Sequence, residues 1–261
     1  MAEYLFGWPG FRPESPTLPA SVPLRRHGVA HYSLMMTSFA DRLLSFLTGF
    51  PLPAALPAGV SAESPYQQPA VQPLLTAFAR QYYASPAPRI ALLGINPGRF
   101  GSGRTGVAFT DPVALADNCG IANPLPRQRE LSSQFIYQVV AAMGGPARFY
   151  QDFYLGSLYP LVLLREERNY NYYDAPALTA ALADDLRLSL HQQVHEVGLR
   201  RTVVVCLGRR NAKYLQQLNQ ELRLFEHIEV LDHPRYLMQY KRRELPQHVA
   251  RYVEVLSALI Q

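Results

Sequence analysis

Residues 89–98 read Arg-Ile-Ala-Leu-Leu-Gly-Ile-Asn-Pro-Gly. A short apolar run that ends at Gly94 and continues into Asn-Pro-Gly is typical of a buried strand entering a tight loop. A second run, residues 202–207, is uninterrupted and rich in β-branched side chains, as are the buried strands of parallel sheets. The two runs therefore predict a parallel sheet that is covered on both faces.

The rest of the chain supplies two further strands and the helices between the strands. Strands are predicted at 153–158 and 227–231, and apolar spacing predicts helices at 39–48, 75–83, 129–143, 174–197, 211–222 and 246–260. The helix at 174–197 has Asp174 as its predicted cap and Pro176 in its first turn. The alternation predicts an α/β fold with three layers, α/β/α, around a central, mostly parallel four-stranded sheet.

The ends of the chain differ in composition. Residues 1–34 are rich in Pro and Gly and lack periodicity, so we expect a disordered or poorly packed arm. Met35-Met36 stands before an amphipathic run and would make a natural start, which leaves an upstream mis-start as another interpretation of the arm. Residues 51–73 are rich in proline, and we predict a linker without a helix or strand there. We predict a single domain over residues 37–261.

Composition narrows the class of protein. There are 25 Lys and Arg against 20 Asp and Glu, a net charge of +5 that suits a polyanionic partner without identifying one. The two cysteines cannot supply an iron–sulfur cluster or an all-cysteine zinc site. With no signal pattern and no apolar run long enough to span a bilayer, we expect a soluble bacterial cytoplasmic protein without metal, cofactor or membrane contact.

A glycine-rich stretch imitates a phosphate-binding loop. Residues 98–105 fit that spacing except that Arg104 replaces the lysine, and residues 101–106 fit G-x-G-x-x-G. Phosphate binding by either pattern requires a strand that turns directly through the glycines into a helix. Here the strand ends early, at Gly94, and residues 106–112 do not read as a helix. A nucleotide-binding hydrolase therefore remains a minor alternative.

Several segments, in order, resemble motifs of the SMUG-type branch of the uracil-DNA glycosylase superfamily. Residues 94–109 resemble its first motif, and His233-Pro234-Arg235 resembles its second catalytic motif. Between them, Leu158-Tyr159-Pro160-Leu161 with Arg168-Asn169 is similar to the central strand and loop, and residues 205–209 to the penultimate strand. The pattern looks closest to a second, bacterial SMUG-like subfamily.

The resemblance implies a monofunctional DNA glycosylase of base excision repair. Such an enzyme hydrolyses the N-glycosidic bond of uracil and related damaged bases and leaves an abasic site. By resemblance, Asn96 positions the attacking water through its carbonyl, and His233 donates a hydrogen bond to the base O2. An amide is a poor base, so stabilisation of the departing base is the larger contribution. No lysine is placed to form a Schiff base.

The same resemblance assigns a base-binding pocket, which comprises Gly94, Ile95, Pro97, Gly98, Phe109 and Ser157. Phe109 would stack on the flipped base, a contact worth ~1–3 kcal/mol. Gly98 stands where the thymine-excluding branch carries a tyrosine, which leaves room for 5-hydroxymethyluracil. Ser157 replaces the asparagine that reads uracil, and one hydroxyl cannot supply a bidentate pattern. Xanthine and hypoxanthine therefore stay open as substrates.

Residues after the second motif are predicted to bind DNA. Tyr236, Leu237 and Met238 occupy the place of the family's wedge, and the predicted phosphate contacts are Arg235, Lys241, Arg242 and Arg243. The expected partner is single- or double-stranded DNA with a damaged base. We expect the protein to act as a monomer on the nucleoid.

Each of these residues also has an ordinary structural interpretation. Asn96 before a proline is a common turn composition, and a histidine before Pro234 is unremarkable at a strand end. Phe109 would more often be part of a core. The Ser157 departure also keeps alive another hypothesis, a catalytically weak protein of the same fold that binds DNA or abasic sites without cleaving them.

Overall fold

The computed structural model describes residues 37–260, and these belong to one compact unit. The predictions for the arm at residues 1–34 and for the start at Met35-Met36 lie outside the described residues. No helix in the described part of the chain is long and apolar enough to cross a membrane.

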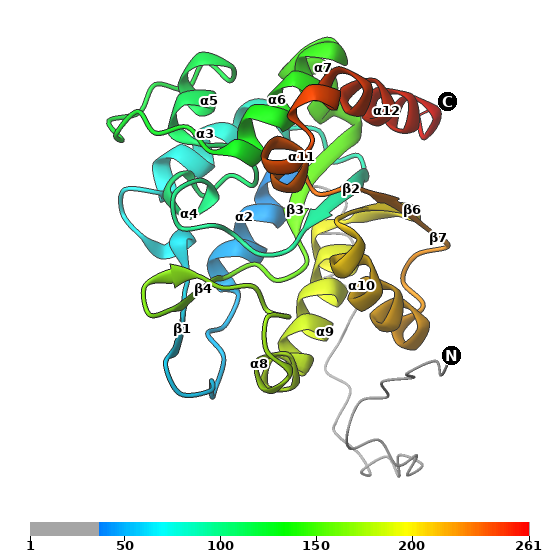
Figure 1. Ribbon diagram of the computed structural model, residues 1–261. Helices are drawn as coiled ribbons and strands as arrows, with labels where there is room; N and C mark the ends of the chain where they lie inside the picture. Colours follow the sequence, from blue (N-terminus) through cyan, green and yellow to red (C-terminus); the bar gives the residue numbers. More distant parts are fainter. Residues whose placement is uncertain (1–36, 261) are drawn as a thin grey trace. The chain divides into compact units, whose positions relative to one another are not determined.

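The central sheet has four strands in the order β3-β2-β6-β7 (Figure 1). They are β2 (Arg89–Gly94), β3 (Phe153–Ser157), β6 (Leu199–Leu207) and β7 (His227–Leu231). Every neighbouring pair is parallel, which confirms the predicted sheet. β2 and β6, which carry the apolar runs at 89–94 and 202–207, lie at its centre, where a strand is covered on both faces and paired on both edges.

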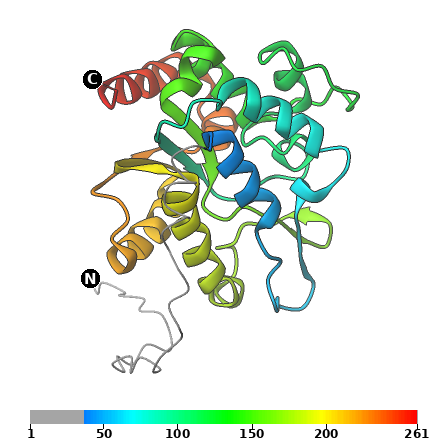
Figure 2. The ribbon, with the colours of Figure 1, turned by 180° about the vertical axis from the view of Figure 1, so that it is seen from behind.

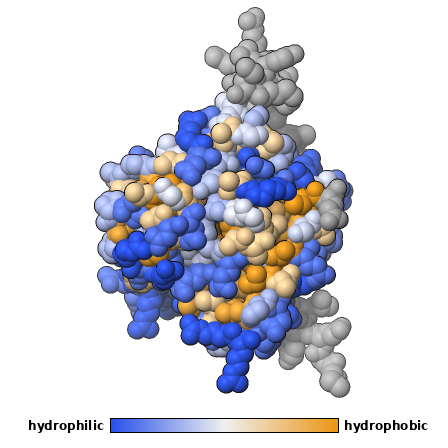
Figure 3. Space-filling view, turned by 90° about the horizontal axis from the view of Figure 1, so that it is seen from above, coloured by the Kyte–Doolittle hydropathy of each residue, from blue (hydrophilic) through white to orange (hydrophobic). Residues whose placement is uncertain are grey.

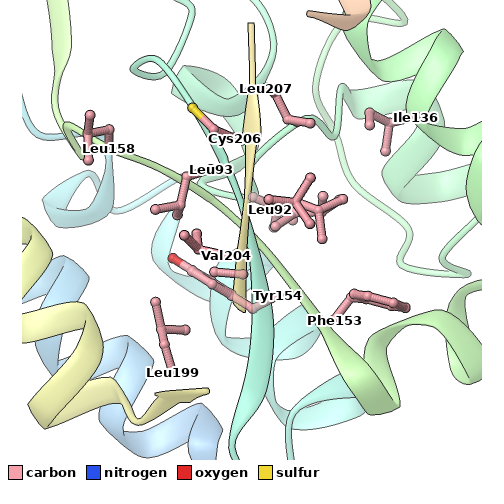
Figure 4. Close-up of a cluster of buried hydrophobic side chains, with 14 of the residues drawn as sticks. Leu92, Leu93, Ile136, Phe153, Tyr154, Leu158, Leu199, Val204, Cys206 and Leu207 are labelled. Carbon is pink, nitrogen blue, oxygen red and sulfur yellow. The ribbon is translucent and has the colours of Figure 1, made fainter. Parts of the chain in front are cut away.

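Side chains leave the central strands alternately toward the two faces, as Figure 4 shows. Leu92, Phe153 and Leu207 point to one side, the side on which Ile136 of a covering helix lies. Leu93, Tyr154, Val204 and Cys206 point to the other side. Both sets are buried, so each face of the sheet forms its own apolar layer.

Helices cover both faces of the sheet, and this confirms the three-layer architecture (Figures 1 and 2). One layer contains α9 (Ala183–Gln192) and α10 (Arg209–Leu222). The other contains α6 (Leu131–Ala142), α11 (Pro234–Tyr240) and α12 (Leu245–Ala258). Figure 3 shows the molecule from above, and the surface on this side mixes hydrophobic and hydrophilic residues. Such a mixture is usual for the side of a helical layer that faces solvent.

A group of helices packs beside the β3 edge of the sheet. Helix α2 (Phe39–Gly49) packs on α3 (Gln72–Tyr82), which in turn contacts α7 (Pro146–Asp152). Ser38 and Asp41 form a reciprocal capping box at the start of α2, where the first N–H groups have no partner within the helix. The predictions of helices at 39–48 and 75–83 are confirmed within a few residues.

A small second sheet was not predicted. Its strands β1 (Val60–Glu63), β4 (Val162–Arg165) and β5 (Arg168–Asn169) pair antiparallel in the order β1-β4-β5. The prediction that residues 51–73 hold no element is therefore wrong, since β1 and the short 3₁₀ turn Pro65–Gln67 lie there. β1 is too short to show a pattern of its own, and its partner comes from far along the chain.

The long helix predicted at 174–197 is also corrected. It is divided into α8 (Pro176–Ala181), α9 and a π turn at Gln193–Val197. Pro176 does lie in the first turn of α8, but Asp174 is not the cap, because its carboxylate accepts hydrogen bonds from the N–H and Nδ2 of Asn171. Asp174 closes the preceding loop instead.

Candidate active site

A cleft of about 610 Å³ opens at the carboxyl ends of the central strands. In a parallel sheet this edge gathers the loops that follow each strand, so it is the usual place for a ligand. Predicted site residues that line the cleft are Ile95, Asn96, Pro97, Gly98, Phe109, Ser157, His233, Arg235 and Tyr236. The fold thus brings together segments that are widely separated in the sequence.

Asn96 follows the end of β2, and its amide is held at both ends. The Nδ2 group donates to the carbonyl of Tyr170 at 3.0 Å, and Oδ1 accepts from the N–H of Tyr172 at 3.2 Å. The two backbone groups differ in kind, so they determine which end of the amide is oxygen. One lone pair of Oδ1 remains for a further donor such as water.

The segment that holds Asn96 is carried by the β4–β5 hairpin. Its two-residue turn is Glu166-Glu167, and both residues have positive φ, 50° and 59°, as a type I′ turn requires. Within the hairpin, the Oδ1 of Asn169 on β5 accepts from the N–H of Arg99 at 2.9 Å. The second sheet therefore fixes one wall of the cleft against the loop that follows β2.

His233 follows β7 and is the N-cap of α11. Its Nδ1 accepts from the N–H of Arg235 at 3.2 Å, so in the neutral ring the proton resides on Nε2. Burial, aided by the positive charge of Arg235, lowers the pKa of His233 to about 4. The imidazole is therefore neutral near pH 7, with one N–H free to donate.

Phe109 lies close to His233 in the same cleft. The ring centroids are 6.0 Å apart and the ring planes are inclined at 48°. The backbone of Phe109 has φ of 54°, an uncommon conformation for an aromatic residue. Hydrogen bonds of the next residue, Thr110, hold the loop in this conformation. The Thr110 carbonyl accepts from the hydroxyl of Thr105 at 2.6 Å, and the Thr110 hydroxyl lies 2.9 Å from the hydroxyl of Tyr137.

Gly94 supports the Phe109 ring rather than lining the cleft. A Cβ at Gly94 would lie 2.5 Å from Cζ of Phe109, so the ring occupies the space that a side chain would take. Ser157 is the partner of Gly94 in the β2–β3 register and does line the cleft. Within residues 37–260, the Ser157 hydroxyl makes no hydrogen bond, which leaves it available to a ligand.

Glu130 is a cleft residue that the sequence did not reveal. It precedes α6 and lies beneath the glycine loop, with a carboxylate oxygen 4.0 Å from the position of a Cβ on Gly98. Burial raises the pKa of Glu130, while Arg235 and a hydrogen bond from Ser132 act in the opposite direction. No local sequence motif marks this half-buried carboxylate as a site residue, because only the tertiary fold brings it under the glycine loop.

The glycine loop does not form a phosphate cradle. Its only helix, α4 (Ser102–Thr105), is a single turn. The N–H groups of Gly101 and Gly103 both donate to the carbonyl of Gly98, at 3.3 and 2.9 Å. Because these donors are satisfied within the loop, they do not point at an anion, which argues against the nucleotide-binding alternative.

The rim of the cleft carries positive charge. Arg99, Arg168 and Arg235 line it, and none of the three forms a salt bridge within the described part of the chain. Arg242 and Arg243 are exposed beyond the end of α11, whereas Lys241 pairs with Glu244. Unpaired guanidinium groups around a cleft are suited to phosphates.

Two residues predicted to reach DNA do not face the cleft. Leu237 and Met238 are buried beneath α11, which corrects the prediction that they act as a wedge. Helical spacing explains the difference, since they occupy the inner face while Tyr236 and Tyr240 occupy the outer one. Tyr240 lies in the cleft lining and was missed for the same reason: the phase of so short a helix is not evident in the sequence.

No group of three or more His, Cys, Asp or Glu side chains in residues 37–260 is arranged to hold a metal ion. Cys119 and Cys206 are both buried and free. What the cleft offers is a set of hydrogen-bonding and aromatic groups: an oriented amide, a neutral imidazole N–H and a phenyl ring.

Comparison with known proteins agrees with this geometry. A family model described as the uracil DNA glycosylase superfamily matches residues 81–257, which include Asn96 and His233. A solved structure titled the crystal structure of WT Pedobacter heparinus SMUG2 is similar, with 35% identity over 86% of this chain and 99% of that one, and a TM-score of 0.83. No curated protein matches this chain.

Proposed function

This chain belongs to the uracil DNA glycosylase superfamily, in its SMUG-type branch, and we propose that Asn96 and His233 carry its reaction. The protein is a DNA glycosylase, which hydrolyses N-glycosyl bonds. We further propose that uracil, 5-hydroxymethyluracil and purine products of deamination such as xanthine are its substrates. The observation that carries the proposal is the presence of both side chains, with Phe109, in one cleft at the carboxyl end of the sheet.

Asn96 positions the water that attacks the sugar carbon. Its Oδ1 is oriented by the Tyr172 N–H and keeps a lone pair for that water. An amide accepts a hydrogen bond but takes up a proton poorly, so its contribution is orientation. Because the amide is already held in place, little ordering remains to be done when the substrate binds.

His233 stabilises the departing base. Rupture of the N-glycosidic bond leaves negative charge on the base, and a donor aimed at a base oxygen lowers the energy of that state. The Nε2–H of His233 is such a donor, and the low pKa of the ring keeps it neutral while it donates. Phe109 stacks on the base beside it, which supports the assignment of this end of the cleft to the base.

The base-reading positions favour a permissive enzyme. Gly98 has no side chain, and a Cβ there would lie at ordinary contact distance, 3.7 Å, from Asn169 Nδ2, so the glycine leaves about the room of one methyl group, which supports a substituent on the 5-position of uracil. Ser157 offers one hydroxyl that can donate or accept, which suits more than one base edge. These features support substrates beyond uracil.

A direct assay tests the proposal. A labelled oligonucleotide with one uracil, 5-hydroxymethyluracil, xanthine or hypoxanthine is incubated with the protein, and alkali then breaks any abasic site. We expect cleavage at uracil, and single-turnover rates lower by about 10²-fold or more in Asn96→Ala and His233→Ala, the usual cost of one positioning group or donor. Leu188→Ala, an exposed residue on α9, serves as control. Near-full activity in either active-site variant would show that its role is misassigned.

A further inference from the structure

We propose that Asn211, at the start of α10, is a positioning residue that holds the water-binding amide of Asn96 in place through Tyr172. The inference rests on the proposed function, since it concerns the reaction assigned to Asn96. It goes beyond that function because the side chains of Asn211 and Tyr172 are fully buried, so a nucleotide in the cleft touches neither of them.

The side-chain amide of Asn211 is hydrogen-bonded at both ends. Its Nδ2 group donates to the carbonyls of Leu93 and Gly94, at 3.2 and 3.0 Å, where β2 ends. Its Oδ1 accepts from the hydroxyl of Tyr172 at 2.6 Å. Burial raises the pKa of Tyr172 well above its ordinary value, so this hydroxyl stays protonated and remains a donor. One amide therefore links the end of β2 to the loop that contains Tyr172.

These two attachment points are the ones that fix Asn96. Gly94 precedes Asn96 by two residues, so the end of β2 sets where the backbone of Asn96 lies. The N–H of Tyr172 donates to Oδ1 of Asn96 at 3.2 Å and sets the direction in which the amide points. Because Asn211 is bonded to both, it fixes the backbone of Asn96 relative to the partner of its side chain.

Other contacts keep Tyr172 in its place when its hydroxyl is removed. The ring packs on Tyr214 of α10, with centroids 5.5 Å apart and planes inclined at 83°. The hydroxyl of Thr179, on α8, donates to the carbonyl of Tyr172 at 3.0 Å. Tyr172→Phe therefore breaks the link to Asn211 and leaves the packing of the ring and the backbone contact unchanged.

A buried amide can also serve the fold alone, by satisfying carbonyls at a strand end. Single-turnover excision of uracil at saturating protein separates the two roles, because it measures the bond-breaking step. We expect a rate about tenfold lower in Asn211→Ala and in Tyr172→Phe, a smaller loss than in Asn96→Ala, since the amide is loosened rather than removed. The protein concentration that gives half the maximal rate should stay unchanged, because neither side chain touches the substrate.

Double variants identify the residue through which Asn211 acts. Asn96→Ala/Asn211→Ala should be as active as Asn96→Ala alone, because no amide remains to be positioned. His233→Ala/Asn211→Ala should be about tenfold slower than His233→Ala, because the amide of Asn96 is still present there. An equal further loss in both backgrounds would overturn the proposal and leave Asn211 with a structural role only.

The chain offers a matched control for each variant. Asn219 lies on the same helix, where its Nδ2 donates to the carbonyl of Phe225 at 2.8 Å and its Oδ1 accepts from the N–H of Leu224 at 3.0 Å. Asn219→Ala should lower Tm and keep the wild-type rate. Tyr66→Phe removes a buried hydroxyl that donates to the carbonyl of Pro160 at 2.8 Å, and it should behave in the same way.

Nuclear magnetic resonance tests the positioning apart from catalysis. In isotope-labelled protein, the side-chain amide signal of Asn96 is the one that disappears in Asn96→Ala. This signal should shift, and its heteronuclear NOE should fall, in Tyr172→Phe but not in Tyr66→Phe. An unchanged signal in Tyr172→Phe would contradict the proposal. If the wild type excises no base, the proposed function fails, yet this signal still decides whether Asn211 and Tyr172 hold Asn96.

Discussion

The imidazole of His233 and the ring of Phe109 lie 6.0 Å apart between centroids and are inclined to each other at 48°. His233 follows the last strand of the sheet, and Phe109 lies in the loop after the first of its strands along the chain. The two rings present a donor and an apolar face to the same volume. A planar base placed there would be stacked and hydrogen-bonded at once, which is the basis of the first predictions.

Activity should not depend on protonation of His233 in the neutral range. Because burial lowers its pKa to about 4, the ring is neutral above that value and becomes a cation only as the pH falls through it. The cation would lose Nδ1 as acceptor for the Arg235 N–H. A single-turnover pH profile for uracil excision should therefore show no acid limb near the ordinary histidine pKa of about 6.5.

The same pKa affects stability. Burial makes His233 harder to protonate in the folded state than in the unfolded state. Its contribution to the free energy of unfolding is therefore complete above the unfolded pKa of about 6.5 and is lost as the pH falls toward the folded pKa of about 4. Urea unfolding across this window, with His233→Gln as the reference, measures that contribution. A histidine-dependent gain in stability on acidification would contradict the assignment of a neutral ring.

Gly94→Ala should weaken base binding without unfolding the protein. Its Cβ would lie 2.5 Å from Cζ of Phe109, so the ring has to leave its position. We expect kcat/KM to fall by about tenfold, the cost of losing a stacked aromatic contact. Gly49→Ala is the matched control, because a Cβ at Gly49 would have nothing within 4 Å. Wild-type activity in Gly94→Ala would show that the ring position is unimportant.

Gly98→Ala should alter selectivity more than activity. The nearest atoms to its Cβ are at ordinary contact distance, Asn169 Nδ2 at 3.7 Å and a Glu130 oxygen at 4.0 Å, so the substitution fits the folded structure. The added methyl group narrows the space available to a substituent on the base. We expect the ratio of 5-hydroxymethyluracil to uracil excision to fall by about tenfold, as for one methyl group in a tight pocket. An unchanged ratio would mean that the 5-position points elsewhere.

The Glu166-Glu167 turn should accept a stabilising substitution. Both residues have positive φ, which costs a side-chain-bearing residue energy that Asn-Gly avoids. Glu166→Asn/Glu167→Gly should raise the free energy of unfolding by about 0.5–2 kcal/mol, measured in urea. Because the hairpin holds Asn96 through Tyr170 and Tyr172, uracil excision should be kept. A lower stability would show that the glutamates serve another role in the turn.

The sequence predicted the central sheet well because its strands carry their own signal. The run that ends at Gly94 and the run at 202–207 are apolar enough to require burial on both faces, and parallel pairing follows from the helices between them. The second sheet had no such signal. β1 pairs with β4 across a long stretch of chain, and four residues in a Pro-rich segment do not reveal a partner.

Site residues divide in the same way. The family motifs, and hence Asn96 and His233, could be read from the sequence, because a strand end followed by a specific loop is a local pattern. How those residues are held depends on the fold: the backbone of Tyr172 orients the amide of Asn96, and Arg235 with burial fixes the neutral state of His233. The fold also placed Glu130 in the cleft and turned Leu237 away from it. Hydrogen-bond partners, burial and the phase of a short helix depend on contacts between distant segments, and no local stretch of sequence contains them.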